Sequence, residues 1–186
     1  MTDRYHHGNL RAQVLATAAD IVAAEGAERL SLRDLARRAG VSHAAPAHHF
    51  GDRRGLFTAL AADGFSGLAD ALHPSVRAGE FAQTAVAYVR FATTHPGHFS
   101  VMFRTSLLDL DDAALRAARE RAGALLGRGL DTVSDERILV DRADAGRTAW
   151  AVVHGIAGLT LAGALPGVDA EALTLAAARQ LFGTAG

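Results

Sequence analysis

The stretch from Ser31 to Phe50 constrains the fold of this chain more than any other part of its sequence. Apolar residues recur at helical spacing behind Ser31, a residue type that caps helix N-termini, and Gly40 then interrupts the helix. A second short helix is expected from Ser42 to Phe50. Two short helices joined by a turn that contains Gly form a helix-turn-helix, whose second helix enters the major groove of DNA. The pattern therefore favours DNA binding, although an ordinary pair of packed helices would also fit it.

Individual residues of this stretch have predicted structural roles. We expect the Ser31 hydroxyl to accept a hydrogen bond from the first helical turn, and Asp34 to add negative charge where the helix end is positive. Gly40 is expected to supply the positive φ that ends the helix, and Val41 to fill the turn from the core side. Ser42 is expected to cap the second helix.

The second helix carries an unusual set of side chains for reading DNA. His43, Ala44, His48 and His49 supply the small or polar surface that can reach base edges. Small Ala side chains can contact thymine methyl groups, and imidazoles can bond to acceptors on purines or phosphates. Contact with phosphate or solvent alone is an equal alternative for each His. Pro46 has no N–H and restricts the residue before it, so the helix is expected to begin as a tight turn.

The first 57 residues resemble the DNA-binding domain of the TetR/AcrR family of transcriptional regulators. The residues that carry the resemblance are Arg11, Val14-Leu15, Ala18-Ala19, Glu25-Gly26, Leu32-Arg33-Asp34-Leu35-Ala36, Ala39-Gly40-Val41-Ser42, His49-Phe50 and Leu56. There are two departures: Ala47 stands where the family usually has a phosphate-contacting Tyr, and Arg53 replaces the usual Lys and keeps its charge. The reading of the residues and the resemblance together predict these DNA-binding positions: Ser31, Arg33, Ser42, His43, Ala44, Ala47, His48, His49 and Arg53.

Helical patterns cover nearly the whole chain, and no segment alternates apolar and polar residues with a period of two. We therefore predict an all-α fold of about nine helices, with a helix-turn-helix domain over residues 1–55 and a C-terminal dimerisation and ligand domain over residues 56–186. We expect a first helix that ends at Gly26 and a long helix that is capped by Asp52 and ends before Pro74. A helix around Phe81–Ala92 should stop at His95, and a short helix should follow near Phe99–Phe103. The next helix should begin at Asp111 or Asp112, and a loop over Asp131–Glu136 should separate it from two final helices over Arg142–Leu165 and Asp169–Phe182.

The C-terminal part carries a second resemblance. Trp150-Ala151-Val152-Val153-His154-Gly155 is similar to the Trp-His-Gly signature of one TetR-type C-terminal domain, and the segment Pro96–Phe103 is similar to another part of it. The resemblance implies dimerisation and an inducer site. A stripe of small residues on the same predicted helix would let another helix approach closely, within the subunit or across a two-fold axis, and we expect the axis: Ala151, Gly155, Gly158 and Ala162.

Aromatic, Met and His side chains are the candidates for lining an apolar ligand pocket, with Tyr88 or His154 as its polar group. They are Phe65, Phe81, Tyr88, Phe99, Met102, Phe103, Trp150 and His154. The alternative is that they simply fill the core. A small, largely apolar effector is expected, because this lining offers many rings and few donors.

Composition narrows the function further. The chain has 19 basic and 20 acidic residues, and every basic residue is Arg, as expected from a GC-rich bacterial genome. Residues 1–55 carry eight Arg against six acidic residues, whereas the remainder carries eleven against fourteen, which suits a DNA-binding end and an acidic effector end. There is no Cys for a disulfide or a zinc thiolate site, and no long apolar run for a membrane span. A cytoplasmic protein that contacts no membrane is expected.

No pattern of catalytic residues stands out. His95 and His98 are separated by Pro96-Gly97, without a carboxylate at a ligand-like offset, and the chain has neither a Gly-rich phosphate loop nor a Gly-x-Ser-x-Gly elbow. We therefore predict no enzyme, catalytic residue, cofactor or bound metal.

The expected function is a ligand-responsive repressor that binds double-stranded palindromic operator DNA as a homodimer, with the long helix from Arg53 to Leu72 as the coupling element. The alternatives are a His-based metal-responsive regulator and a helical enzyme or adaptor.

Overall fold

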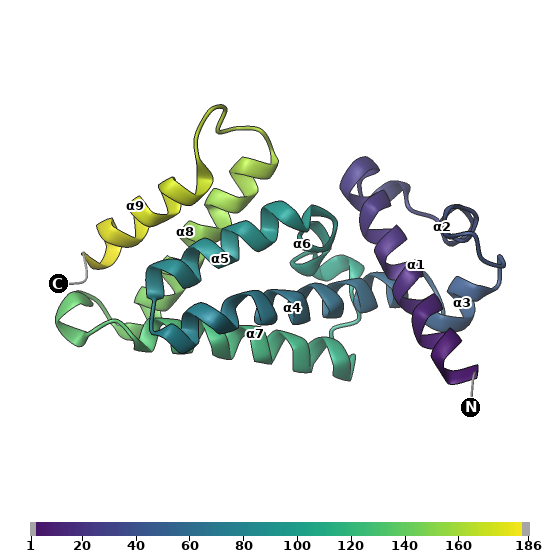
Figure 1. The fold of residues 1–186 in the computed structure, drawn as a ribbon, viewed down its shortest axis with the longest axis horizontal. Helices are drawn as coiled ribbons and strands as arrows, with labels where there is room; N and C mark the ends of the chain where they lie inside the picture. The colour runs from purple at the N-terminus through teal and green to yellow at the C-terminus, as the bar shows by residue number, and fades with distance from the viewer. Residues whose placement is uncertain (1–2, 184–186) are drawn as a thin grey trace. The chain divides into compact units, whose positions relative to one another are not determined.

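The computed structural model describes residues 3–183, which form nine α-helices and three short 3-10 helices without a β-strand (Figure 1). This confirms the predicted all-α fold. The α-helices are α1 (Asp3–Glu25), α2 (Leu32–Ala39), α3 (Ala45–Phe50), α4 (Arg53–Ala78), α5 (Phe81–Thr94), α6 (Pro96–Met102), α7 (Ala113–Asp131), α8 (Arg142–Leu161) and α9 (Ala170–Phe182). The 3-10 helices are η1 (Ala27–Arg29), η2 (Thr105–Leu107) and η3 (Asp135–Arg137).

The ends of α1 and α2 follow the local sequence. Gly26 leaves α1 with φ 85°, and the Ser31 hydroxyl accepts a hydrogen bond from the Asp34 backbone N–H at 3.2 Å. Gly40 ends α2 with φ 67° and ψ 30°, the left-handed conformation that glycine adopts without steric cost. The predicted caps of the first helix of the helix-turn-helix are therefore confirmed.

The start of α3 differs from the prediction. Ser42 does not cap the helix with its side chain, because residues 43–44 first form a turn in which the Ala45 N–H donates to the Ser42 carbonyl at 3.0 Å. The helix then starts at Ala45 and places Pro46 in its first turn, where a missing N–H leaves no helical hydrogen bond unmade. The tight turn expected from Pro46 is present, and it displaces the cap.

Helix α4 is predicted to end before Pro74, and this prediction is wrong. The Asp52 carboxylate caps its N-terminus, accepting from the Gly55 N–H at 2.8 Å, but the helix continues through Pro74 to Ala78. A proline inside a helix costs about 3 kcal/mol. The buried apolar side chains of this helix, such as the fully buried Leu72 just before the proline, stabilise it beyond that point.

The later helices begin behind aspartates. Asp112 is one of the two predicted starts of α7, Asp169 is the predicted start of α9, and α8 begins at the predicted Arg142 with Asp141 as a cap that is not predicted. Asp112 accepts from the Leu115 N–H at 2.8 Å, and Asp141 and Asp169 cap α8 and α9 in the same way. Helix α8 ends at Leu161 rather than at the predicted Leu165.

The described residues divide into two compact units. The first unit contains the residues up to Phe65 together with His95–Arg119, and the second contains Ser66–Thr94 together with the residues from Glu120 onward. The described part of the predicted helix-turn-helix domain lies in the first unit, where α2 packs against α1 and α3 (Figure 1). In the second unit α5, α8 and α9 pack on one another. Helices α4 and α7 contribute residues to both units.

A glycine brings α6 onto α1 within the first unit. The two helices contact each other so closely that a Cβ atom at Gly97 would collide with the backbone carbonyl of Ala19. Gly97 follows Pro96 at the start of α6, so the position of this short helix depends on a residue without a side chain. No helix in the described range combines the length and apolar character needed to cross a lipid bilayer.

Candidate nucleic-acid interface and apolar pocket

Helix α3 separates its anchors from its exposed face. Pro46 and Phe50 are buried, and the Arg11 guanidinium of α1 lies 5.3 Å from the centre of the Phe50 ring. The predicted DNA-binding residues of this segment are exposed, except for His49, which is half-buried: Ser42, His43, Ala44, Ala47 and His48. Of the predicted reading surface, the segment thus exposes His43, Ala44 and His48, together with Ala47, whereas His49 is only partly exposed.

The other predicted DNA-binding residues lie at helix N-termini. Ser31 and Arg33 are located at the start of α2, and Arg53 is exposed as the first residue of α4. The Arg53 guanidinium donates to the carbonyl of Ala27 at 2.6 Å and lies 5.1 Å from the centre of the Phe57 ring. Because a guanidinium has five N–H donors, these contacts hold Arg53 in place and leave donors for a further acceptor.

Several arginines of this region are bound within the protein. The Asp34 carboxylate accepts from Arg37 and from Arg38, each at 2.7 Å, and the Arg37 hydrogen bond contributes most to lowering the pKa of Asp34. Arg38 also pairs with Glu25 of α1 at 2.6 Å, which raises the pKa of its guanidinium. The Arg38–Glu25 pair joins α2 to α1, whereas the pairs of Asp34 lie within α2.

The two adjacent histidines of α3 differ in their surroundings. Their rings lie edge to face with centres 5.5 Å apart. His49 also lines a depression of about 220 Å³ together with Arg11, Asp109 and Asp112, whereas His48 does not. His48 is therefore the outward member of the pair.

The structure divides the residues predicted for one ligand pocket between the two units. Phe65, Phe99 and Phe103 pack together in the first unit, with the Phe103 ring centre 5.4 Å from each of the other two, and Met102 is buried in the same unit. The other four lie in the second unit: Phe81, Tyr88, Trp150 and His154. The sequence singles out these side chains but does not show which of them meet, nor that Trp150 is 42 % exposed.

Tyr88, His154 and Trp150 form a hydrogen-bonded group. The hydroxyl of the fully buried Tyr88 lies 3.0 Å from His154 Nδ1 and accepts from Trp150 Nε1 at 3.2 Å. Burial raises the pKa of Tyr88 and lowers the pKa of His154, so both groups are favoured in their neutral forms. A neutral His154 accepting at Nδ1 lets Tyr88 donate to it and accept from Trp150 at once. Both predicted polar groups are thus already hydrogen-bonded to each other.

A small apolar pocket lies beside this group, between α5, α7 and α8. It has a volume of about 40 Å³ and is lined by Phe81, Thr84, Ala85, Tyr88, Leu126, Leu130, Gly146, Ala149, Trp150 and Val153. A wider depression of about 450 Å³ along α7 and α8 shares Leu126, Leu130, Gly146 and Trp150 with it. Ligand pockets usually span about 300–1,000 Å³, so the inner pocket would have to widen toward the depression to hold an effector.

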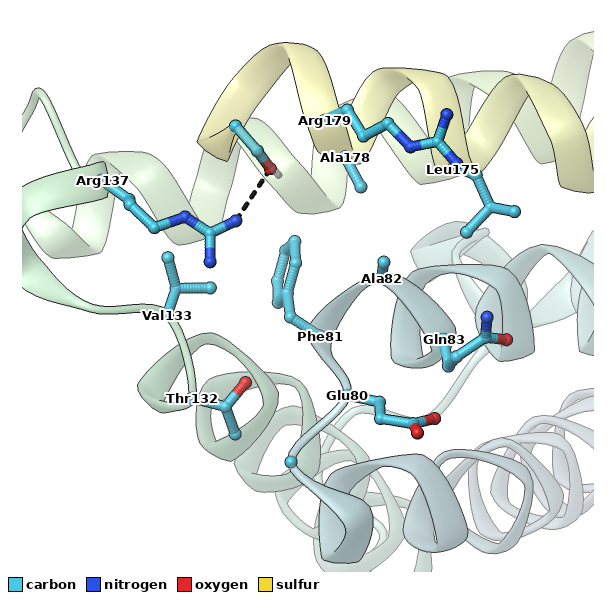
Figure 2. A pocket seen from close by; sticks show the side chains of 12 residues that line it. Glu80, Phe81, Ala82, Gln83, Thr132, Val133, Arg137, Leu175, Ala178 and Arg179 are labelled. Atoms are coloured by element: carbon cyan, nitrogen blue, oxygen red, sulfur yellow. Dashed lines mark hydrogen bonds between the residues drawn. The ribbon is translucent and has the colours of Figure 1, made fainter. Parts of the chain in front are cut away.

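A second pocket of about 370 Å³ lies in the same unit (Figure 2). Figure 2 shows Phe81 between α9 and the α7–α8 connection, with Arg137 and Arg179 on the α9 side. Arg137 donates to the carbonyls of Phe182 at 2.5 Å and Gly183 at 2.8 Å, which fixes its position. Of the predicted ligand residues, only Phe81 lines this pocket.

The small residues predicted for dimerisation all lie on the exposed side of α8. Ala151, Gly155, Gly158 and Ala162 are exposed, and a Cβ atom at either glycine would have no atom within 4 Å. Leu159, on the same helix, is 49 % exposed. This face is therefore open and apolar in the single chain.

Comparison with known families decides the identity of the fold. Residues 14–60 match the bacterial regulatory proteins of the tetR family, and residues 81–181 match the family described as tetracyclin repressor-like, C-terminal domain. The chain belongs to the TetR family. It is accordingly a DNA-binding transcriptional regulator, and the predicted resemblance is confirmed.

Solved structures agree with this identification of a TetR-family regulator. A protein of unknown function from Rhodococcus sp. RHA1 is 34 % identical, with a TM-score of 0.79 and 97 % of each chain covered. The TetR-family transcriptional regulator PfmR from Thermus thermophilus is 24 % identical, with a TM-score of 0.72 over 95 % of this chain and 97 % of its own. NalD, the secondary repressor of the MexAB-OprM multidrug efflux pump in Pseudomonas aeruginosa, is 19 % identical, with a TM-score of 0.60 and 94 % of each chain covered. No curated protein matches the sequence.

Two features of this TetR-family chain are missed by sequence reasoning. The pocket of Figure 2 joins three segments that are far apart in the chain, and no sequence signal marks it. The binding of Arg53 to Ala27 is also missed, because the sequence shows a charge but not its internal acceptor. Among the described residues, no three His, Asp or Glu side chains gather closely enough to hold a metal ion.

Proposed function

We propose that this TetR-family regulator is a homodimeric repressor that binds a palindromic operator through α3 and releases it when a small apolar effector binds. The observation that carries the proposal is the division of α3 into buried anchors, Pro46 and Phe50, and an exposed face of small and imidazole side chains. A helix held in this way can enter the major groove without losing its packing. The regulator would act in the cytoplasm, where its operator DNA is located.

The predicted DNA-binding residues fall into two roles. Ser31, Arg33 and Arg53 lie at the starts of helices, where backbone N–H groups and guanidinium groups suit phosphate oxygens. The remaining positions belong to the α3 segment and face the bases, with His49 and Ser42 at the edge of the set: Ser42, His43, Ala44, Ala47, His48 and His49. Arg53 is the strongest candidate for a fixed phosphate contact, because its bond to Ala27 already orients it.

The exposed small-residue face of α8 supports the dimer. Ala151, Gly155, Gly158 and Ala162 leave room for the backbone of a second chain to approach across a two-fold axis. A two-fold dimer presents two α3 helices, so its DNA site is expected to be an inverted repeat with half-sites about one helical turn, or a multiple, apart.

The second unit contains the features that support release of the operator DNA by an effector. The apolar pocket beside Tyr88 and Trp150 offers apolar surface and polar groups that are already bonded, which favours a neutral ligand. Helix α4 contributes residues to both units, so a ligand that binds better to a dimer with the wrong α3 spacing would shift the population away from the DNA-binding form.

A selection from random double-stranded DNA tests the proposal directly. The selected sequences should contain an inverted repeat, and the logarithm of the affinity should fall with the logarithm of salt concentration by about 0.9 per phosphate neutralised. Arg53→Ala should weaken binding to all sequences and make the salt slope shallower by about one unit per half-site. His43→Ala should instead relax the preference at one base position. Selection without a repeat, or binding that ignores salt, would contradict the proposed function.

A further inference from the structure

The face of α3 that is proposed to read DNA has no permanent positive charge. Between Arg38 and Arg53 the chain contains no Arg, and it contains no Lys anywhere. The arginines on either side are bound internally: Arg37 and Arg38 to Asp34, Arg53 to the Ala27 carbonyl, and Arg54 to the Leu108 carbonyl at 2.9 Å. The only groups on this face that can become cationic are imidazoles, at positions 43, 48 and 49.

We propose that His43 and His48 bind DNA as imidazolium ions, so that each half-site takes up protons when the operator binds. This inference rests on the proposed function, in which α3 is the element that meets the DNA. It assigns to these two side chains a charge state and a ligand chemistry, namely phosphate oxygens and the acceptor atoms of purine edges.

The chemistry of imidazole supports this assignment. Imidazole is the side-chain group whose reference pKa, about 6.5, lies nearest to physiological pH, so a nearby charge can change whether it carries a proton. The phosphates of a DNA duplex bring about one negative charge per 1.7 Å of helix axis, which favours the protonated ring. Protonation also turns one N–H donor into two, and DNA presents acceptors on both phosphates and bases in the groove.

Contact between neighbouring rings strengthens the coupling. The His48 and His49 rings are 5.5 Å apart, so two protonated rings would place like charges close together. Phosphates placed near the pair offset this repulsion. More protons are therefore bound in the complex than in the free protein, and binding draws them from solution.

The charged groups around α3 identify which histidines respond. Among the described side chains they are Arg11 on α1, Arg33 and the bound group Asp34, Arg37 and Arg38 on α2, Asp52, Arg53 and Arg54 at the start of α4, and Asp109 and Asp112 before α7. His49 is half-buried in the depression that it lines with Arg11 and the two latter aspartates. His43 and His48 are exposed, and within the described residues neither ring forms an ion pair. The linked protons are therefore assigned to these two.

The test is the affinity for the selected operator, measured by fluorescence anisotropy from pH 5.5 to 8.5 at constant ionic strength. The wild-type affinity should rise as pH falls, with a slope in log affinity that approaches one per linked His in each half-site. His43→Gln and His48→Gln should each lower the slope of the profile, because Gln donates an N–H but takes up no proton. His48→Arg should lower the slope to the same extent, because its charge does not titrate, and should bind more tightly at pH 8.5 than His48→Gln.

A matched control is His73→Gln, since His73 is exposed on α4 in the second unit. Its profile should equal that of the wild type. A double variant His43→Gln/His48→Gln with an unchanged slope would overturn the inference, and so would a slope that disappears only in His49→Gln. A protein that selects no inverted repeat at any pH would instead contradict the proposed function, and the two failures are distinct.

Discussion

The two units of this TetR-family regulator leave different kinds of surface uncovered. Among the described residues, seven large apolar side chains are exposed, and only one of them, Leu110, belongs to the first unit. The second unit exposes the other six: Leu139, Val140, Trp150, Leu159, Leu161 and Val168. Around α3 the first unit exposes imidazoles and small side chains instead.

This difference corresponds to two kinds of partner. A surface of polar groups that are anchored from within suits a polyanion, which binds through many weak electrostatic and hydrogen-bonding contacts. Exposed apolar side chains beside a row of small residues suit a second protein surface, because burying them releases water and lets backbones approach. In the proposed dimer, the second unit would bury apolar side chains that the single chain exposes, whereas the first unit would meet DNA with side chains that are already held in place.

The largest expected effect comes from placing a bulky charged residue on the exposed small-residue face of α8. Gly158→Arg places a long charged side chain where nothing lies within 4 Å in the single chain, so the monomer should fold normally. The dimer should fail, because the charge would be buried against the partner. Since one α3 then acts alone, the operator affinity should fall by about 10²–10⁴-fold. Sedimentation and gel shift measure the two losses together.

Gly123→Arg is the matched control for this variant. Gly123 also has no neighbour within 4 Å, but it lies on α7 and is not a residue of the small-residue stripe of α8. It should leave the dimer and the DNA affinity unchanged. If Gly158→Arg remains a dimer in sedimentation, the face of α8 does not form the interface and the contrast between the units loses its main support.

The next prediction compares Gly97 of the first unit, where a Cβ atom would collide with its surroundings, with Gly123 of the second, where a Cβ atom would have no neighbour within 4 Å. Gly97→Ala forces a Cβ against the Ala19 carbonyl and should lower the free energy of unfolding by about 1–3 kcal/mol. Gly123→Ala lies in an exposed helix interior, and it should raise the stability by up to about 1 kcal/mol. Urea unfolding of both variants gives the comparison. Equal stabilities would show that α6 moves away from α1 at no cost.

A smaller effect tests the apolar pocket of the second unit. Trp150 is the only Trp of the chain and lines this pocket, so a neutral probe such as N-phenyl-1-naphthylamine should change its fluorescence and weaken operator binding. Ala149→Phe should fill the pocket and reduce probe affinity by about tenfold or more, while DNA binding without probe persists.

Ala124→Phe is the control, because Ala124 is exposed on α7 and is not a residue of the pocket. It should leave probe binding unchanged. Equal probe affinity in wild type and Ala149→Phe would place the probe elsewhere, and the cavity of Figure 2 would then be the next site to test.

The same contrast explains which features could be predicted from the sequence. The caps at Ser31, Gly40 and Asp52 depend on atoms within a few residues, and the sequence predicts them correctly. The continuation of α4 through Pro74 depends on buried contacts with other elements, and local rules give the wrong end. Periodicity identifies the inward aromatic residues, but their division into two clusters depends on the tertiary fold.

The same limit applies to the candidate sites. Two helices that are adjacent in sequence are enough to predict most of the exposed side chains around α3, and their contact with DNA stays a prediction. The internal bond of Arg53 and the pocket of Figure 2 require segments that meet only after folding. The exposed face of α8 is predicted as a stripe of small residues, while its openness could be seen only in the folded chain.

The smallest expected effect concerns the histidine inside the second unit. Burial lowers the pKa of His154, so its value in the folded protein lies below that of about 6.5 in the unfolded chain. The unfolded chain therefore binds more protons between these two values, and stability rises with pH in that window. The contribution of His154 is fully present above about pH 6.5 and is lost as pH falls through the folded pKa.

His154→Gln keeps a partner for the Tyr88 hydroxyl and removes the titration. The decrease in melting temperature between pH 7.5 and 5.5 should thus be smaller in this variant than in the wild type. The control is His73→Gln, which replaces an exposed ring, and its decrease should equal that of the wild type. An identical loss in His154→Gln and in the wild type would show that protonated His154 is accommodated in the folded unit, and that this group is not held neutral as its contacts with Tyr88 and Trp150 require.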